Sequence, residues 1–201
     1  MGIIGITGGI ACGKSTATAY LKRYIPYVTD GDEITARLYG PQSILGEELT
    51  AVFDKDLIIN PDGSINKKNL GNIVFNDKQS LEKLNGIIQP VIRKKITLSL
   101  NRYDRFPSKH QLLDLALMFE YGYDKLCDEV WVIDTPDEIR IGRLCRRNHI
   151  APEEATKIIN NQISRKERLD RADVIIDNSR SLHNTENQLR KAYRNFCKNN
   201  Y

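Results

Sequence analysis

The sequence of 201 residues has little of what marks disulfide-stapled, zinc-binding or membrane-spanning chains. Its four cysteines are scattered without a CxxC pair and its three histidines are isolated, so we expect neither a disulfide framework nor a structural zinc site. No apolar run approaches the roughly 18 residues that cross a bilayer. The first residues lack a basic region followed by a long apolar stretch, so we expect no signal peptide and predict a cytoplasmic protein.

What the sequence does contain is typical of a globular protein. Hydrophobic residues make up 40% and charged residues 28% of the chain, with 13 glycines and 7 prolines, which disfavours disordered and fibrous classes. The length predicts one domain. The net charge is +4, but the segment from Arg140 to Arg171 alone holds nine basic and four acidic residues. This segment indicates either a polyanionic partner, such as nucleic acid or nucleotide phosphate, or simply a solvated charged helix.

The hydrophobic pattern alternates short strands with helices. Strands are expected at 3–6, 27–29, 111–115, 130–133 and 174–176, and helices at 14–24, 30–39, 136–147, 152–168 and 181–198. Such alternation predicts an α/β fold, a parallel sheet wrapped by helices. The stretch from 43 to 105 is helical apart from the turn signal Asn60–Gly63, and Pro90 is expected to kink its last helix or to start that helix's second part.

A glycine-rich turn follows the first predicted strand. The residues from Gly8 to Ser15 match G-x-x-x-x-G-K-[ST], with a strand before and a helix after. Gly8 and Gly13 permit backbone angles that a Cβ would oppose, so successive N–H groups can form a nest for phosphate beside a helix N-terminus. Lys14 supplies a charge for the β- and γ-phosphates, Ser15 a hydroxyl for Mg²⁺, and Thr16 a further donor. The motif predicts binding of a nucleoside triphosphate.

Three classes of phosphate-loop protein then compete. The guanine-reading motif of a GTPase is incomplete, because Asn66–Asn69 lacks the required Asp. The segment Leu112–Leu115 lacks the Asp-Glu pair of many motor ATPases. A small-molecule kinase needs a basic lid that closes over its phosphates, and the Arg140–Arg171 segment is a candidate. The sequence therefore favours a kinase.

Several segments together resemble the dephospho-CoA kinase family over nearly the whole chain. The similar segments are the phosphate loop Thr7–Thr16, the acidic Asp30–Ile34, the apolar Asn72–Asp77, Ala116–Glu120, the positions Arg143, Arg147 and Gln162, and the closing Ala172–Asn178. The chain departs from the family pattern at Ala11 and Cys12 (usually Gly and Ser), Lys67 (usually Arg), Gln89 (usually His), Ala116 (usually Pro) and Arg140 (usually Gln).

The resemblance implies a three-layer phosphate-loop NTPase fold with a helical acceptor-binding insertion and a helical lid. A single domain over 1–201 would then have its core at about 1–31, 106–140 and 172–201, its insertion at 32–105 and its lid at 141–171. The implied reaction transfers phosphoryl from ATP to the ribose 3′-hydroxyl of dephospho-CoA, giving coenzyme A and ADP. ATP, Mg²⁺ and dephospho-CoA are the implied ligands, with no specific nucleic acid and no membrane, in a monomer or small homo-oligomer.

The same resemblance assigns residues to roles. Asp32 and Lys14 are catalytic, and Ser15 holds Mg²⁺. The implied ATP-binding residues are Gly9, Ala11, Cys12, Gly13, Lys14, Ser15, Thr16, Arg143, Arg147 and Asn178. The implied acceptor-binding residues are Asp32, Lys67, Gln89 and Glu120.

Several of these side chains have other interpretations. Asp30 with Glu33 forms a helix-capping pattern, so capping competes with catalysis for Asp30 and Asp32. Glu120 could equally start a helix, Arg147 lie on the surface, and Asn178 belong to an ordinary turn. For Cys12, the loop N–H groups and Lys14 favour a reactive thiolate, whereas burial of the thiol would prevent its reaction.

Two other functions stay open from the sequence: a kinase for another nucleoside or nucleotide, and a nucleic-acid-binding ATP switch that uses the basic segment.

Overall fold

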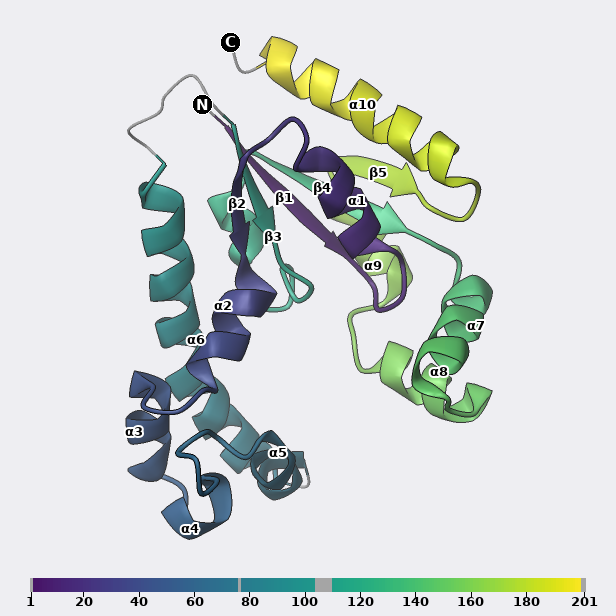
Figure 1. Cartoon of the computed structure of the whole chain (residues 1–201). Helices are drawn as coiled ribbons and strands as arrows, with labels where there is room; N and C mark the ends of the chain where they lie inside the picture. The colour runs from purple at the N-terminus through teal and green to yellow at the C-terminus, as the bar shows by residue number, and fades with distance from the viewer. Residues whose placement is uncertain (1, 76, 104–109, 200–201) are drawn as a thin grey trace. The chain divides into compact units, whose positions relative to one another are not determined.

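The computed structural model describes residues 2–75, 77–103 and 110–199, in two compact units (Figure 1). The first unit is Met1–Thr29 with Arg102–Tyr201, and the second is Asp30–Asn101. The junction predicted near 105–106 lies outside the described residues.

The first unit is built on a parallel sheet. Its strands are β1 (Ile3–Gly8), β2 (Tyr27–Asp30, whose last residue belongs to the second unit), β3 (Gln111–Asp114), β4 (Glu129–Asp134) and β5 (Val174–Asp177). In the described part of the chain they lie in the order β2-β3-β1-β4-β5, and the pairings of β1 with β3, β1 with β4 and β4 with β5 are parallel. The register sets Ile6 of β1 opposite Asp114 of β3 and Trp131 of β4. Because parallel strands end at one edge, this arrangement collects the turns after β1, β3, β4 and β5 there.

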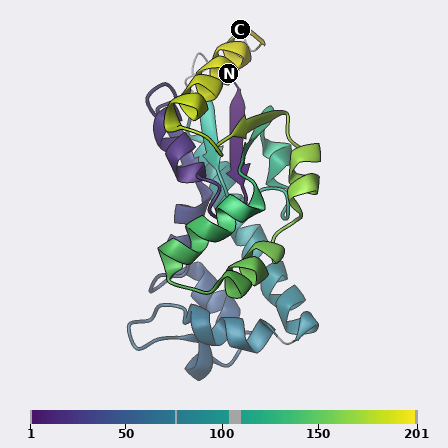
Figure 2. The ribbon, with the colours of Figure 1, turned by 90° about the vertical axis from the view of Figure 1, so that its right-hand side faces the viewer.

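Helices cover both faces of the sheet (Figure 2). On one face, α1 (Lys14–Leu21) and α10 (Leu182–Asn199) pack on each other and on β1 and β5. The 3₁₀ helix η1 (Tyr123–Leu126) contacts β1, and α9 (Arg165–Asp170) contacts β4. The core between the sheet and α10 holds Ile4, Trp131 and Phe196, none of them exposed, and each such side chain contributes about 1.5–3 kcal/mol. The predicted three-layer phosphate-loop fold is confirmed.

The remaining helices of the first unit are α7 (Asp137–Asn148) and α8 (Pro152–Asn160), which pack together through Leu144, Ala155 and Ile159. The prediction of one helix over 152–168 is wrong. The chain turns after α8, and Ser164 then starts α9, because its hydroxyl accepts from Glu167 N at 3.1 Å. The helix expected at 14–24 ends as α1 at Leu21 and continues as turns through Tyr24.

The second unit is helical in its described residues. It holds α2 (Gly31–Leu38), α3 (Ile44–Thr50), α4 (Lys55–Ile58), α5 (Lys67–Phe75) and α6 (Lys78–Asn101). The expected turn is present, with Gly63 N donating to Asn60 O at 2.9 Å. Helix α6 continues through Pro90 and buries Leu84, Ile88 and Ile92 on one face. Among the described residues of both units, we find no helix with the length and apolarity needed to traverse a lipid bilayer.

Candidate active site

The backbone prediction for the turn after β1 is right for Gly13 and wrong for Gly8. Gly8 does not have a positive φ, and glycine is needed there for space, because a Cβ would lie 2.5 Å from Cys12 Sγ and 2.6 Å from Ile133 O. Gly13 has φ +93° and Ala11 has φ +63°, both left-handed, and α1 begins directly at Lys14. A Cβ on Gly13 would lie 2.0 Å from Asn178 Nδ2, so glycine is required here for space as well as for conformation. The loop therefore delivers the positive end of α1 to the carboxyl edge of the sheet.

Carbonyl groups of this loop are held by donors from distant segments. Cys12 O accepts from Asn178 Nδ2 at 2.7 Å and from Thr135 Oγ1 at 3.1 Å. Arg143 Nη1 contacts Ala11 O and Cys12 O at 3.4 Å, and its Nη2 donates to Asn178 O at 2.9 Å. Because the N–H of a trans peptide points opposite its C=O, fixing Cys12 O fixes the Gly13 N–H on the other side of the loop. By holding the carbonyl side of the loop, these donors fix the direction of the N–H groups that would bind phosphate.

A buried arginine braces the first half of the loop. Arg140 is 2% exposed; its Nε donates to Ile10 O at 2.9 Å and its Nη1 to Asp137 Oδ1 at 2.7 Å. Its Nη2 lies 3.3 Å from Gln162 Oε1, which also accepts from Ile10 N at 2.7 Å. Both polar groups of Ile10 are therefore satisfied by side chains of the predicted lid and its border. This brace ties the loop to α7 and to the segment after α8.

The ammonium group of Lys14 is held by a carboxylate at the end of the neighbouring strand β3. Its ammonium forms an ion pair with Asp114, whose other oxygen accepts from Thr18 Oγ1 at 2.7 Å. Asp114 ends β3, and its side chain is only 6% exposed. A pair so shielded from water keeps much of its Coulomb attraction, so Asp114 fixes where the Lys14 charge sits.

The phosphate loop and the start of α1 line one pocket of about 840 Å³ in the first unit. The structure brings together there every residue that the sequence assigned to ATP: Gly9, Ala11, Cys12, Gly13, Lys14, Ser15, Thr16, Arg143, Arg147 and Asn178. Ala116, Leu117 and Gln162 also contribute to its wall. Arg147 is exposed, with its Nε donating to Asn148 Oδ1 at 2.9 Å, whereas Arg143 is engaged with the loop. The pocket is large enough for a nucleotide.

The residues predicted for the acceptor lie elsewhere. Asp32, Lys67 and Gln89 belong to the second unit, where Lys67 Nζ sits 4.6 Å from the centre of the Tyr39 ring. Asp32 is exposed in the first turn of α2. Glu120 belongs to the first unit, outside the residues that line the pocket, and its Oε1 accepts from Ile163 N at 3.4 Å.

Asp30 performs the capping role that the sequence offered as its alternative. Its Oδ1 accepts from Glu33 N at 2.8 Å, and its backbone is extended just before α2. Capping of α2 is therefore a sufficient reason for an aspartate at position 30, and the capping carboxylate is that of Asp30 and not that of Asp32.

The predicted thiolate at Cys12 is wrong. The Cys12 side chain is 2% exposed, and burial raises the pKa of its thiol; hydrogen bonding to the Lys14 backbone and nearby positive charges lower it only in part. Desolvation outweighs the surrounding donors because a thiolate loses its hydration in an apolar setting. Cys12 packs in the core cluster with Ile133 and Ile176, and acts there as a small apolar residue.

Two residues that hold the phosphate loop and Lys14 in place, Asp114 and Arg140, were not predicted from the sequence. Asp114 was considered only as part of an incomplete motor motif, although an acidic residue at the end of a buried strand was an available signal. Arg140 was noted only as a departure from the family pattern, and no local signal tells that a charged side chain will be buried beneath a loop 130 residues away.

Comparison with known proteins identifies the family. A model of the dephospho-CoA kinase family matches residues 2–184. The dephospho-CoA kinase of Symbiobacterium thermophilum is 39% identical, covering 98% of this chain and 82% of that protein. That of Fusobacterium nucleatum is also 39% identical, covering 97% and 96%. The solved dephospho-CoA kinase from Campylobacter jejuni superposes with a TM-score of 0.74 at 29% identity, covering 99% and 98%. The chain therefore belongs to the dephospho-CoA kinase family.

Proposed function

We propose that the phosphate-loop pocket of this kinase binds ATP with Mg²⁺, and that the second unit supplies most of the acceptor contacts. The enzyme is a transferase that phosphorylates dephospho-CoA with ATP, in the biosynthesis of coenzyme A. The observation that carries the assignment of roles is the convergence of the loop with Lys14, Ser15, Arg147 and Asn178 on one pocket. Phosphoryl transfer needs mainly positioning and charge stabilisation, which such a site provides.

On the ATP side, the loop N–H groups and the start of α1 would hold the β-phosphate, and Lys14 would move from Asp114 to bridge the β- and γ-phosphates. Arg143 is engaged with loop carbonyls, so we assign it to holding the loop in shape. Arg147 is exposed at the pocket and has the planar fork that pairs with phosphate oxygens, so we assign it to the transferring group.

The donor atoms present fit Mg²⁺. Ser15 places a hydroxyl, a hard oxygen ligand, on the pocket wall in the first turn of α1. Mg²⁺ in kinases keeps several waters and is bound by substrate phosphates with one or two protein oxygens, so no cage of protein carboxylates is needed. When bound, Mg²⁺ would supply positive charge to the phosphates. The residue that holds it would be Ser15.

For the acceptor, the resemblance and the exposed carboxylate favour Asp32 as the base. The 3′-hydroxyl oxygen forms its bond to the γ-phosphorus as the bond to the β–γ bridging oxygen breaks, ADP leaves, and the hydroxyl proton passes to Asp32. Lys67, Gln89 and Glu120 are proposed acceptor contacts. Gln89 can donate and accept hydrogen bonds but cannot titrate, so no proton step depends on position 89.

We propose the segment 141–171 as a lid. It contains Arg147 and Gln162, and it contacts the loop through the apolar cluster of Leu144, which includes Ile10 and Ala11. Closure over bound ATP and acceptor would exclude water. Hydrogen exchange in α8 should slow when both ligands are bound, and unchanged exchange at saturation would contradict the lid.

The acceptor assay tests the reaction itself. ADP release is measured with dephospho-CoA, adenosine or AMP as acceptor, with Mg²⁺ and after its removal by EDTA. We expect turnover with dephospho-CoA far above the others, lost with EDTA and restored by Mg²⁺. Faster turnover with adenosine or AMP would favour a kinase of another nucleoside or nucleotide. Salt-sensitive RNA binding tighter than dephospho-CoA binding would favour the nucleic-acid switch.

A second test separates chemistry from folding at Lys14. The Lys14→Ala variant should lose turnover and also unfold more easily, because Asp114 would keep its buried charge without the ammonium. Adding Asp114→Asn should recover stability without recovering turnover. Turnover near that of the wild type in Lys14→Ala would refute the phosphate-loop assignment.

We place the enzyme in the cytoplasm as a monomer or small homo-oligomer. Size-exclusion chromatography with light scattering tests the oligomeric state.

A further inference from the structure

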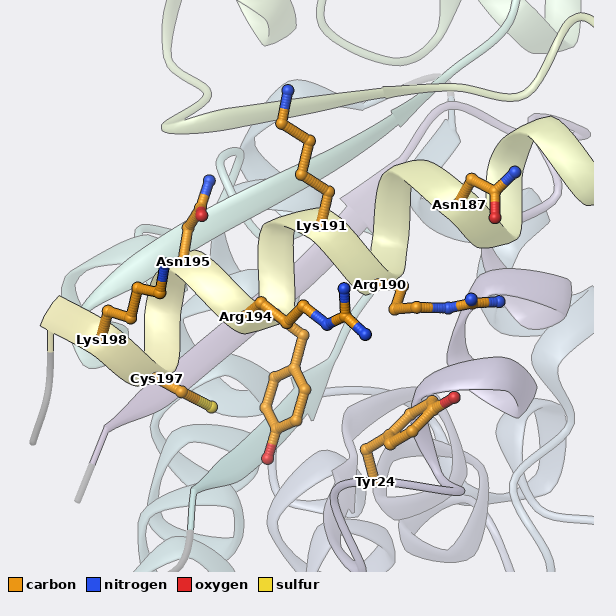
Figure 3. A pocket seen from close by; sticks show the side chains of 9 residues that line it. Tyr24, Asn187, Arg190, Lys191, Arg194, Asn195, Cys197 and Lys198 are labelled. Atoms are coloured by element: carbon orange, nitrogen blue, oxygen red, sulfur yellow. The ribbon is translucent and has the colours of Figure 1, made fainter.

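A second hollow lies at the other end of α1 from the phosphate loop (Figure 3). It has a volume of about 730 Å³ and is formed by the outer side of α10 with Tyr24, in the turn after α1. None of its lining residues lines the phosphate-loop pocket. Helix α1 has eight residues and spans about 12 Å, so the two sites are separated by the length of that helix.

The amphipathic pattern of α10 creates the charged side of this hollow. Leu189, Ala192 and Phe196 are buried, which turns the side chains between them outward. Arg190, Arg194 and Lys198 follow at four-residue spacing, about 6 Å apart along the helix. Lys191 also lines the hollow, but its side chain points away from Tyr24 (Figure 3). In Figure 3 the side chain of Arg194 extends along α10 toward the base of Arg190, and the guanidinium of Arg190 points onward on the side of the helix where Tyr24 lies.

These cations keep their charge available. Among the residues that the structure describes, none of Arg190, Lys191, Arg194 and Lys198 forms an ion pair, and no carboxylate lines the hollow. Glu186 lies one turn before Arg190 and attracts its charge. Like charges held along one helix face repel one another, and an anion bound among them would relieve that repulsion.

An aromatic wall stands beside the cations. The side chain of Tyr24 is 44% exposed, and its ring centre lies 5.9 Å from that of Tyr193 and 5.6 Å from that of Tyr20. Arg190 Nε donates to the Tyr20 hydroxyl at 3.2 Å, which links the aromatic and cationic groups. The packed neighbours hold the Tyr24 ring in place, and an exposed ring in a fixed position offers a surface for stacking a flat base.

We propose that this hollow is a second nucleotide site, for a nucleoside diphosphate or triphosphate. The base would stack on Tyr24 and the phosphates would bind Arg190 and Arg194, with Lys198 adding charge. The volume lies in the range of about 300–1,000 Å³ that is common for small-molecule sites, so a single nucleotide fits the hollow. This site is separate from the reaction proposed above and does not require it.

The test uses a reporter inside the hollow. Tyr24→Trp keeps an aromatic ring and adds a fluorescent side chain to the hollow. The native Trp131 is fully buried, so quenching of tryptophan fluorescence by a stacked base reports on position 24. The titration is done in a background with both Lys14→Ala and Asp114→Asn, which weakens nucleotide binding at the phosphate loop and avoids the unpaired buried charge of Lys14→Ala alone. ADP, adenosine and inorganic pyrophosphate are compared at low salt. We expect saturable quenching by ADP, weaker quenching by adenosine, and none by pyrophosphate.

Arg194→Glu and Lys125→Glu form a matched pair, because each reverses one exposed charge and only Arg194 lines the hollow. Arg194→Glu should weaken ADP binding by about tenfold or more, as expected for a lost charged hydrogen bond, while Lys125→Glu leaves it unchanged. Equilibrium dialysis of ADP on the same two variants with native Tyr24 checks that the tryptophan did not create the site. Equal effects of the two variants, pyrophosphate competing as well as ADP, or quenching by an oligonucleotide alone would overturn the proposal.

Discussion

Replacement of Gly13 by alanine tests the geometry of the phosphate loop most directly. Alanine at φ +93° is strained by about 1–2 kcal/mol. Its Cβ would also lie 2.0 Å from Asn178 Nδ2, so Asn178 must move and lose its 2.7 Å hydrogen bond to Cys12 O. Leaving the buried amide of Asn178 without this acceptor adds about 1–3 kcal/mol. We expect Gly13→Ala to lower the free energy of unfolding by about 2–5 kcal/mol in total.

The assay combines thermal unfolding with ATP kinetics. A loss of this size lowers the Tm by roughly 4–20 °C for a chain of this length, and the displaced loop should raise the KM for ATP. Gly86→Ala is the matched control, because Gly86 lies in the interior of α6 and a Cβ there meets nothing within 4 Å. That variant should be more stable by about 0.5–1 kcal/mol, with ATP kinetics unchanged. A Gly13→Ala protein with the wild-type Tm and KM would refute the reasoning.

Three further predictions concern single side chains. Asp32→Asn should lower kcat by about 10²–10³-fold with little change in the KM for ATP. Asp30→Asn should change kcat much less, because asparagine also caps helices. Equal losses of kcat in both variants, in proportion to their losses of stability, would show that Asp32 is not catalytic. Iodoacetamide at pH 7.5 should leave Cys12 unlabelled in the folded protein, as peptide mass spectrometry would show, because burial raises the pKa of its thiol. Burial lowers the pKa of His110, so the unfolded chain binds a proton on this residue more readily than the folded chain, and stability should fall as the pH drops below about 6.5. In His110→Gln, the free energy of unfolding measured with denaturant should decrease less between pH 7 and pH 5 than in the wild type. An identical decrease would contradict this.

The sequence by itself determined the features that depend on neighbouring residues. The strand, glycine turn and helix around Lys14 were predictable because they depend on local backbone preferences and on the residues that a phosphate nest requires. The alternation of strands and helices was enough to predict a parallel sheet, because each covered strand reads as a short apolar run. Asp30 as a helix cap could be proposed from Glu33 three residues later, since capping is a contact within one turn.

Only the tertiary structure decided what depends on distant parts of the chain. The pKa of Cys12 follows from what buries it, and the sequence around it, rich in donors, indicated the opposite direction. Arg140 reaches Ile10, and Asn178 reaches Cys12, across 130 and 166 residues. Whether Arg143 contacts phosphate or the loop's own carbonyls likewise depends on where α7 places it, next to the loop after β1 and Asn178 after β5. The residue types set which interactions are available, and packing selects among them because a buried polar group must find its partner wherever the fold places one.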